Sequence, residues 1–177
     1  YIGSHTVVEL IREGFQPIII DNLCNSSEKN LEGIKAIARV DVSWYNVDCS
    51  KEEELREVFE KEENINGAIH FAAYKSVEES VRLPEKYYKN NIGSLQVLLE
   101  LMKKHKVNNL IFSSSCTVYG TPDILPVTED TPFKKAESPY GETKQICEQC
   151  FHLIICFCAQ DSKNPMFRPP SARRHYL

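Results

Sequence analysis

Short apolar runs alternate with segments of helical period along most of the chain. The β-branched run at residues 18–20 and the apolar runs at 42–47, 67–72 and 110–112 predict strands. Apolar residues at helical spacing predict helices around residues 7–11, 31–37, 55–59 and 84–105, and one from Pro139 onward, with Ser26-Ser27-Glu28 and Ser50 as expected N-caps.

This alternation of strand and helix predicts an α/β fold. Its spacing implies parallel βαβ units with right-handed crossovers, and so a Rossmann-type doubly wound parallel sheet. Ligands of such sheets sit outside the carboxyl ends of the strands. The residues that carry chemistry should therefore follow the apolar runs, at Asp21, Asp48, 71–75 and 113–117, and the long loop at 120–138 is a further functional candidate.

Composition indicates one globular domain. The chain has 177 residues, 42% of them hydrophobic and 26% charged, which is enough to bury a core. The net charge of -4 speaks against a nucleic-acid binder. The apolar stretch at 151–159 is far shorter than the roughly 20 residues of a membrane span, so no membrane partner is expected. Residues 164–177 hold arginines and no acid, and we expect an irregular basic tail after a domain at 1–163.

The cysteines indicate a reducing compartment. There are seven, they do not space out like a disulfide framework, and no secretory signal stands at the start of the chain. Reduced thiols and a cytoplasmic location are therefore expected. The cysteines at 147–158 share one predicted apolar helix, where cysteine usually acts as a small hydrophobe. No metal is expected, although the spacing leaves zinc open as the less favoured alternative.

Tyr140 and Lys144 form the most informative motif. Residues four apart on a helix share a face, so the phenol and the ammonium can be neighbours. A free phenol has a pKa near ~10, and a nearby positive charge lowers it. The pair could then exchange a proton with a substrate hydroxyl while a nicotinamide cofactor exchanges hydride. Taken alone, the spacing is common on surface helices.

Two hydroxyls strengthen this interpretation. Ser115 and Thr117 follow a predicted strand, 25 and 23 residues before Tyr140, and a serine there could hydrogen-bond the oxygen that Tyr140 deprotonates. Simple turn chemistry at a strand end is the alternative. Strand, hydroxyl cluster, long loop and Tyr-Lys helix in this order are far more specific than any one of them.

Two further residues suggest a dinucleotide. Asp21 follows its strand where an acid can accept hydrogen bonds from the adenosine ribose and repel a 2′-phosphate, which favours NAD over NADP. It could equally be a turn residue. Gly3 precedes the first helix and could end a phosphate-binding loop, although a lone glycine is weak evidence.

In six blocks the sequence resembles the extended short-chain dehydrogenase/reductase family, and within it the UDP-hexose 4-epimerases. The blocks are YIGSHT at 1–6, IDN at 20–22, HFAAYKSV at 70–77, YYKNN at 87–91, FSSSCTVYG at 112–120 and SPYGETK at 138–144. They occur in order over residues 1 to about 163.

This resemblance implies roles for the candidate residues. Tyr140 would be the base, Lys144 its partner, and Ser115 and Thr117 would hold the reacting hydroxyl of the sugar. The cofactor would be NAD, and the residues implied to line it, besides Tyr140 and Lys144, are Gly3, Asp21, Asn22, Asp48, Phe71, Ala72, Lys75 and Asn90. Asp21 and Asn22 would bind the adenosine ribose, and Asp48 would face the adenine.

The implied reaction inverts C4 of a UDP-hexose and so interconverts UDP-galactose and UDP-glucose, a step of galactose metabolism. C4 is transiently oxidised, the sugar turns over while UDP stays anchored, and hydride returns to the other face. The resemblance also implies a homodimer of the whole enzyme, paired through helices around 84–105 and 139–160.

The sequence departs from the family pattern at both ends. A first strand and the earlier glycines of the phosphate loop are missing before Gly3, and a UDP-sugar domain is missing after the Tyr140 helix. We therefore expect a fragment that is inactive alone and binds NAD weakly. The alternatives are a nucleotide-sugar 4,6-dehydratase or decarboxylase, although no acidic pair follows the serines, and a non-catalytic Rossmann-type binding module.

Overall fold

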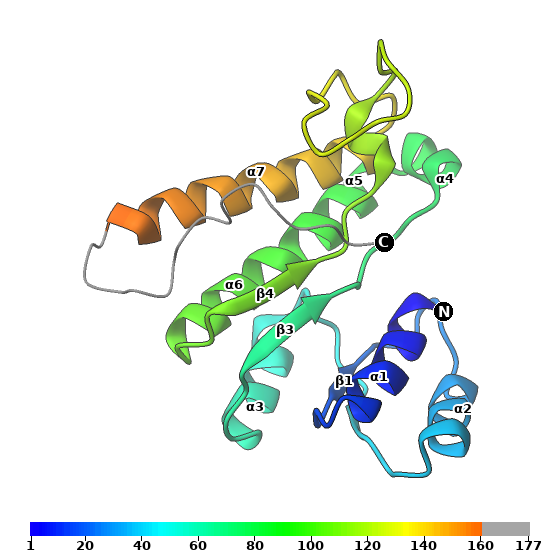
Figure 1. The fold of residues 1–177 in the computed structure, drawn as a ribbon, viewed down its shortest axis with the longest axis vertical. Coiled ribbons are helices and arrows are strands. Elements are labelled where there is room, and N and C mark those ends of the chain that lie inside the picture. Colours follow the sequence, from blue (N-terminus) through cyan, green and yellow to red (C-terminus); the bar gives the residue numbers. More distant parts are fainter. Residues whose placement is uncertain (161–177) are drawn as a thin grey trace.

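The computed structural model describes the backbone of residues 1–160 and the side chains of residues 1–150. The element order, shown in Figure 1, is α1 (Ile2–Arg12), β1 (Ile18–Ile20), α2 (Lys29–Ala38), β2 (Ser43–Tyr45), α3 (Glu52–Lys61), β3 (Gly67–His70), α4 (Val77–Arg82), α5 (Pro84–Tyr87), η1 (Tyr88–Ile92), α6 (Gly93–Lys104), β4 (Asn109–Phe112), η2 (Cys116–Tyr119) and α7 (Pro139–Gln160). The α/β prediction is confirmed. The expected basic tail at 164–177 lies outside the described residues.

All strand pairing is parallel, but the strands form two separate pairs. β1 pairs with β2, with Ile18 opposite Ser43, and β3 pairs with β4, with Gly67 opposite Asn109. Among the described residues no strand lies between β1 and β3, so the sheet is incomplete, as the resemblance implies. The gap between the two pairs matters for the site, because the carboxyl ends of β1 and β3 face the same space.

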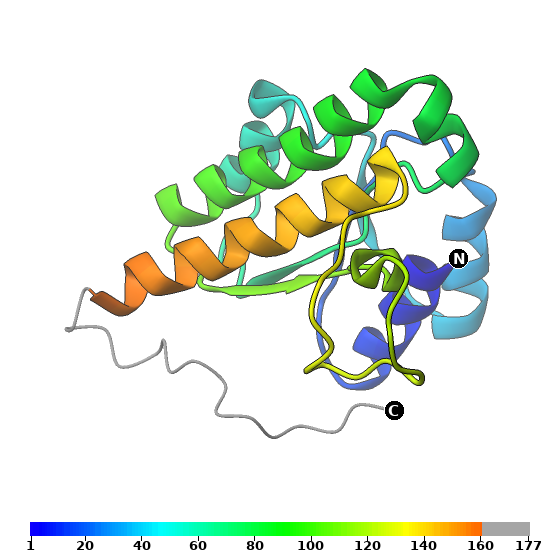
Figure 2. The ribbon, with the colours of Figure 1, turned by 90° about the horizontal axis from the view of Figure 1, so that it is seen from above.

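Helices cover the strands in two groups. Figures 1 and 2 show α6 and α7 side by side along the β3–β4 pair, with α1 and α2 gathered near β1. The predicted inward face of α3 is confirmed, since Leu55 and Phe59 are buried. They belong to a core cluster with Leu98, Leu101, Met102 and Val107. This cluster fixes α3 and α6 against the sheet.

The helix predicted over 84–105 is interrupted. Pro84 does occupy its first turn, but residues 88–92 form a turn of π-helix between α5 and α6. π-turns insert an extra residue into a helix and are frequent at functional sites. Here the turn contains Asn91, which is 2% exposed and takes several hydrogen bonds. Apolar spacing does not reveal the turn, because the Asn91 side chain in it makes its hydrogen bonds to residues of other segments.

Two local predictions about caps have different outcomes. The N-cap of α2 is Glu28, within the predicted Ser26-Ser27-Glu28 run, but its side chain makes no capping bond, and Ser27 Oγ accepts a hydrogen bond from the Lys29 amide (3.3 Å). Ser50 does not cap α3, which begins after Lys51. The Ser50 hydroxyl donates instead to the Asp48 carboxylate at 2.7 Å, because that acceptor is only two residues away.

Candidate functional site

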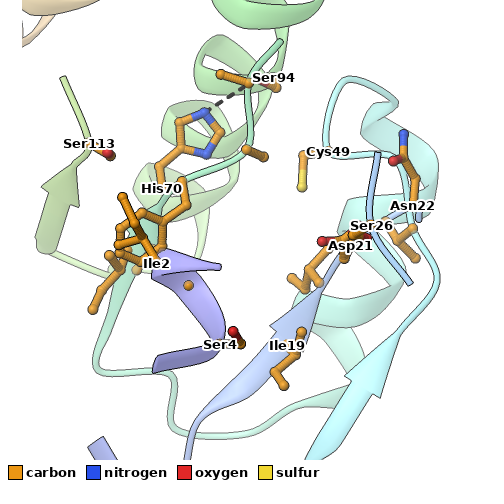
Figure 3. A pocket seen from close by; sticks show the side chains of 18 of the residues that line it. Ile2, Ser4, Ile19, Asp21, Asn22, Ser26, Cys49, His70, Ser94 and Ser113 are labelled. Carbon is orange, nitrogen blue, oxygen red and sulfur yellow. Dashed lines mark hydrogen bonds between the residues drawn. The ribbon is translucent and has the colours of Figure 1, made fainter. Parts of the chain in front are cut away.

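A cavity of about 730 Å³ opens at the carboxyl ends of β1 and β3 and extends between the two strand pairs. Figure 3 shows Asp21 and Asn22 on one side of it and Ser113, which follows β4, on the other. Every residue predicted to contact the cofactor lines this cavity: Gly3, Asp21, Asn22, Asp48, Phe71, Ala72, Lys75, Asn90, Tyr140 and Lys144. Tertiary folding thus gathers residues that lie up to 141 positions apart in the sequence.

Two carboxylates define one end of the cavity. Asp21 Oδ1 accepts hydrogen bonds from the Leu23 amide and the Ser26 hydroxyl, both at 2.8 Å. For Asp48, burial opposes ionisation, but hydrogen bonds from the Ser50 amide and hydroxyl outweigh it and lower the pKa of the carboxyl. The local bonds orient both acids, and these side chains provide the acceptors that a ribose or adenine requires.

The N-terminus of α1 lies against the segment that follows β3. A Cβ built on Gly3 would meet Phe71 Cδ2 at 3.6 Å, an ordinary van der Waals distance. The space around position 3 would therefore admit a Cβ, and crowding does not explain the glycine. What the geometry does provide is a helix N-terminus on the cavity wall, where free backbone amides favour an anion such as a phosphate.

Tyr140 and Lys144 lie on the opposite wall, in the first turns of α7. Ser138 Oγ accepts a hydrogen bond from the Gly141 amide (3.1 Å) and so caps the helix beside the tyrosine. The Tyr140 ring is 9% exposed and meets Tyr87 edge to face, with the ring centroids 6.5 Å apart. Tyr87 is fully buried. The capped turn and the ring contact hold the phenol in place.

Lys144 is an almost fully buried cation. It is 4% exposed, and Nζ donates to the Ser113 carbonyl at 2.7 Å and lies 4.6 Å from the centroid of the Phe112 ring. Burial lowers the pKa of this ammonium. Because the carbonyl and the ring fix Nζ at the carboxyl end of β4, its charge acts on groups in the cavity.

Ser115 and Thr117 do not line the cavity. Thr117 lies in the short turn η2, Ser115 is the N-cap of that turn, and the Thr117 hydroxyl donates to Ser115 Oγ at 3.0 Å. The turn presses on α7, since a Cβ on Gly141 would meet the Thr117 carbonyl oxygen at 3.3 Å. The two hydroxyls therefore lie next to the Tyr140 turn, at the edge of the site. Their hydrogen bond to each other satisfies part of their hydrogen-bonding capacity.

The sequence analysis missed the residues that pack around the Tyr140 turn and Lys144 and hold them in position. The Ser113 carbonyl and the buried side chains of Asn91 and Thr143 were not singled out. A signal exists for two of them, since Asn91 follows Asn90 directly and Thr143 stands between Tyr140 and Lys144. Their partners come from distant segments, and no local pattern marks them.

His70 is a buried histidine with a hydrogen-bond partner. It is 4% exposed, and its Nε2 lies 3.3 Å from Ser94 Oγ, as Figure 3 shows. Burial, helped by the positive charge of Lys144, lowers the pKa of the imidazole to about 4. The folded protein therefore holds this ring neutral where the unfolded chain would protonate it.

The His70 imidazole should make stability fall with acid. Between pH 6.5 and about 4 the unfolded chain binds a proton that the folded protein does not, so the free energy of unfolding rises with pH there. We expect His70 alone to remove about 2 kcal/mol between pH 7 and pH 5. Urea titrations of the chain and of His70→Phe at both pH values measure this. An equal loss in the variant would contradict it, and His5→Asn, at an exposed histidine, is the control.

Other site types find little support in the described part of the chain. Over residues 1–150 no three His, Cys, Asp or Glu side chains converge as a metal site would require, and Cys24, Cys49, Cys116, Cys147 and Cys150 are free thiols. Cys156 and Cys158 lie outside the described side chains. No described helix has the length and apolar character to cross a membrane.

Comparison with known proteins matches residues 1–154 to the NAD dependent epimerase/dehydratase family. The chain is 48% identical over 161 residues to a UDP-glucose 4-epimerase of Dictyostelium discoideum, a match that covers 91% of this chain and 45% of the relative. The Haemophilus influenzae UDP-glucose 4-epimerase is also 48% identical, over 84% of this chain and 44% of that protein. The chain thus spans about half the length of the curated relatives it matches.

Solved structures agree with the sequence matches. The crystal structure of UDP-glucose 4-epimerase from Bifidobacterium longum in complex with NAD+ and UDP superposes with a TM-score of 0.86 at 44% identity. The match covers 89% of this chain and 47% of that one. The fold of the described residues is therefore that of these epimerases over their shared half.

Proposed function

The chain belongs to the NAD dependent epimerase/dehydratase family, and we propose that it is the NAD-binding part of a UDP-glucose 4-epimerase. One observation carries the proposal. The residues assigned to a dinucleotide from sequence line a single cavity, with two carboxylates at one end and the Tyr140–Lys144 pair at the other. The 48% identity to UDP-glucose 4-epimerases supports this substrate over those of other family members.

The donor set fits NAD. Asp21 and Asn22 would hold the adenosine ribose, Asp48 would face the adenine, and the N-terminus of α1 at Gly3 would meet the pyrophosphate. Phe71, Ala72, Lys75 and Asn90 would line the rest of the dinucleotide. When bound, NAD supplies reversible hydride exchange with the sugar.

The protein's own residues would handle the proton. Tyr140 would take the proton of the C4 hydroxyl and later return it, acting as base and then acid. The buried ammonium of Lys144 would favour the phenolate by its charge. Ser115 and Thr117, in the turn that touches Gly141, would bind the sugar hydroxyl at the edge of the site.

A chimera tests the activity. This chain replaces the matching residues of the Dictyostelium discoideum enzyme, which supplies the rest of the length, and conversion of UDP-galactose to UDP-glucose is measured. We expect turnover within about tenfold of the parent, since the exchanged parts share 48% identity. A folded chimera that binds UDP but does not turn over would contradict the proposal. Sedimentation of the same chimera tests the predicted homodimer.

Asp21 should set the choice between NAD and NADP. In Asp21→Asn the carboxylate that would accept the ribose hydroxyls and repel a 2′-phosphate is lost. We expect the ratio of the NADP to the NAD dissociation constant to fall about tenfold, or ~1.4 kcal/mol. Calorimetry on the chimera measures both constants. Asp41→Asn, at an exposed acid paired with Lys35, is the control, and an unchanged ratio in Asp21→Asn would exclude this role.

A further inference from the structure

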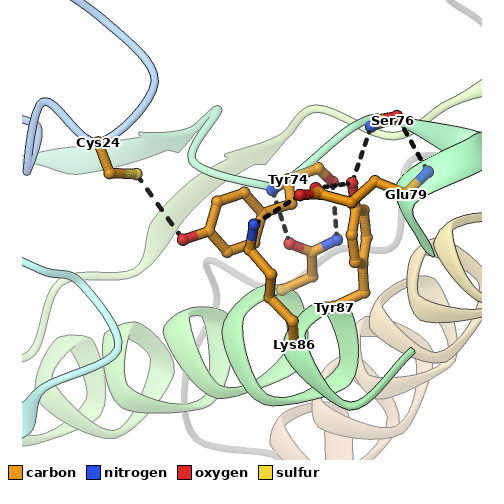
Figure 4. Close-up of polar contacts among 7 residues, drawn as sticks. Cys24, Tyr74, Ser76, Glu79, Lys86 and Tyr87 are labelled. Carbon is orange, nitrogen blue, oxygen red and sulfur yellow. Dashed lines mark hydrogen bonds and ion pairs between the residues drawn. The ribbon is translucent and has the colours of Figure 1, made fainter. Parts of the chain in front are cut away.

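The cavity lies between two parts of the chain that share little polar contact. Residues 1–61 carry its two carboxylates, and residues 67–150 carry the tyrosine and the lysine of α7. Within residues 1–150 a single hydrogen bond joins these two parts. In it the Cys24 thiol donates to the phenol oxygen of Tyr74, with 3.9 Å between sulfur and oxygen. Figure 4 shows this contact, which we call the Cys24–Tyr74 bridge.

Both partners of the bridge line the cavity. Cys24 follows β1 and stands three residues after Asp21, which would hold the adenosine ribose. Tyr74 follows β3 and directly precedes Lys75, which would line the dinucleotide. A ligand held by both Asp21 and Lys75 would therefore have the bridge next to it, at the carboxyl ends of the two strands.

The Tyr74 ring is supported by residues outside the cavity. Lys86 Nζ lies 4.2 Å from the ring centroid, within the range of a cation–π contact. Lys86 is held in turn by Glu79 Oε1 at 2.8 Å, and Glu79 Oε2 accepts a hydrogen bond from the Tyr87 hydroxyl at 2.7 Å. The fully buried Tyr87 ring also packs against Tyr74, with the ring centroids 5.7 Å apart. These contacts fix the ring so that its hydroxyl reaches Cys24, as Figure 4 shows.

The bridge is the weaker end of the Tyr74 side chain. A thiol is a weak hydrogen-bond donor, and Cys24 is exposed, so water can replace either partner when the bond breaks. The contacts of the ring with Lys86 and Tyr87 do not depend on this bond. The bridge can therefore open and re-form at low cost, which is what a contact across an entry path requires.

We propose that Tyr74 is a positioning residue that closes the cavity over the adenosine part of the dinucleotide through its bridge to Cys24. The bridge opens when the dinucleotide enters or leaves. The identity of the ligand rests on the proposed function, whereas the bridge does not. Because the bridge forms in both the free and the bound protein, its loss favours opening equally in both states. The association and dissociation rate constants should therefore rise together, and their ratio should stay almost constant.

Alkylation tests the bridge without any dinucleotide. In the 177-residue chain, iodoacetamide modifies exposed thiols, and peptide mass spectrometry gives the rate at Cys24 relative to Cys116, which is also exposed. Tyr74→Phe removes the hydroxyl and keeps the ring contacts. We expect the ratio to rise about threefold, because the Cys24 thiol loses its partner. Tyr88→Phe, outside the cavity, should leave the ratio unchanged. An unchanged ratio in Tyr74→Phe would overturn the bridge.

Stopped-flow fluorescence of NADH with the chimera tests the role toward the dinucleotide. We expect Tyr74→Phe to raise both rate constants about fivefold, with the dissociation constant within about twofold of the parent. Cys24→Ala removes the same bond from its other end and should act alike. The double variant should match either single variant, because one bond can be lost only once.

Three outcomes would count against parts of this account. Multiplied effects in the double variant, or unchanged rate constants in Tyr74→Phe, would overturn the role of the bridge. A rise in the dissociation rate constant alone would overturn it too, because it indicates a direct contact of the hydroxyl with the ligand. A parent chimera that binds no NADH would instead count against the proposed function, and the alkylation ratio would still decide on the bridge.

Discussion

Tyr140→Phe in the chimera is expected to lower kcat for UDP-galactose by about a thousandfold, the range of a lost general base. The substitution removes only the hydroxyl. The ring keeps its edge-to-face contact with Tyr87, and the Ser138 cap of α7 is untouched. Binding of the nucleotide sugar should stay near that of the parent, so the loss should appear in kcat and not in KM.

The matched control for Tyr140 is Tyr88→Phe. Tyr88 stands in η1, and its phenol donates to the exposed carboxylate of Glu142 on α7, outside the cavity. It should keep kcat within about twofold of the parent, as expected of an exposed surface contact. If the parent chimera is active and Tyr140→Phe turns over at the same rate, the assignment of Tyr140 as the base is refuted.

Lys144→Met is expected to lower kcat about a hundredfold while leaving the protein nearly as stable. The charge that would favour the phenolate form of the base is lost. Stability should respond differently. The buried ammonium already has its pKa lowered by desolvation, so removing the charge recovers part of that cost and offsets the lost bond to the Ser113 carbonyl.

Two measurements separate these effects. Urea titration should place the free energy of unfolding of Lys144→Met within about 1 kcal/mol of the parent. The kcat of the same variant for UDP-galactose, measured in the chimera, should fall about a hundredfold. Lys144→Arg keeps the positive charge but replaces the compact ammonium with a planar guanidinium. Its kcat should therefore stay below that of the parent. Normal turnover in Lys144→Met would contradict the role.

Several features follow from local sequence alone. The apolar spacing of Leu55 and Phe59 defines the buried face of α3, and the chain enters α5 at Pro84 because proline suits a first helical turn. Positions directly after strands could be assigned to the site because the carboxyl ends of parallel strands face one edge. For this reason the predicted cofactor residues that follow strands share one cavity, namely Asp21, Asn22, Asp48, Phe71, Ala72 and Lys75.

The predictions that differ from the structure concern groups whose partners are remote. Spacing predicts one helix over 84–105, whereas contacts to Tyr74 and Thr143 occupy the π-turn at Asn91. The hydrogen bond between the Thr117 hydroxyl and Ser115 Oγ is likewise not marked by any sequence pattern, and the predicted role of both hydroxyls toward the sugar stays a prediction.

What this sequence determines by itself is the order of its elements, their buried faces and the positions of its reactive groups. Periodicity and turn residues act over a few residues, so they can be read without a partner. Only the tertiary structure decided that the strands form two pairs with a cavity between them, that Lys144 bonds the Ser113 carbonyl, and that Asn91 joins two walls of the site. Such contacts depend on how distant elements pack, and a hydrogen bond is lost within about 1 Å of displacement.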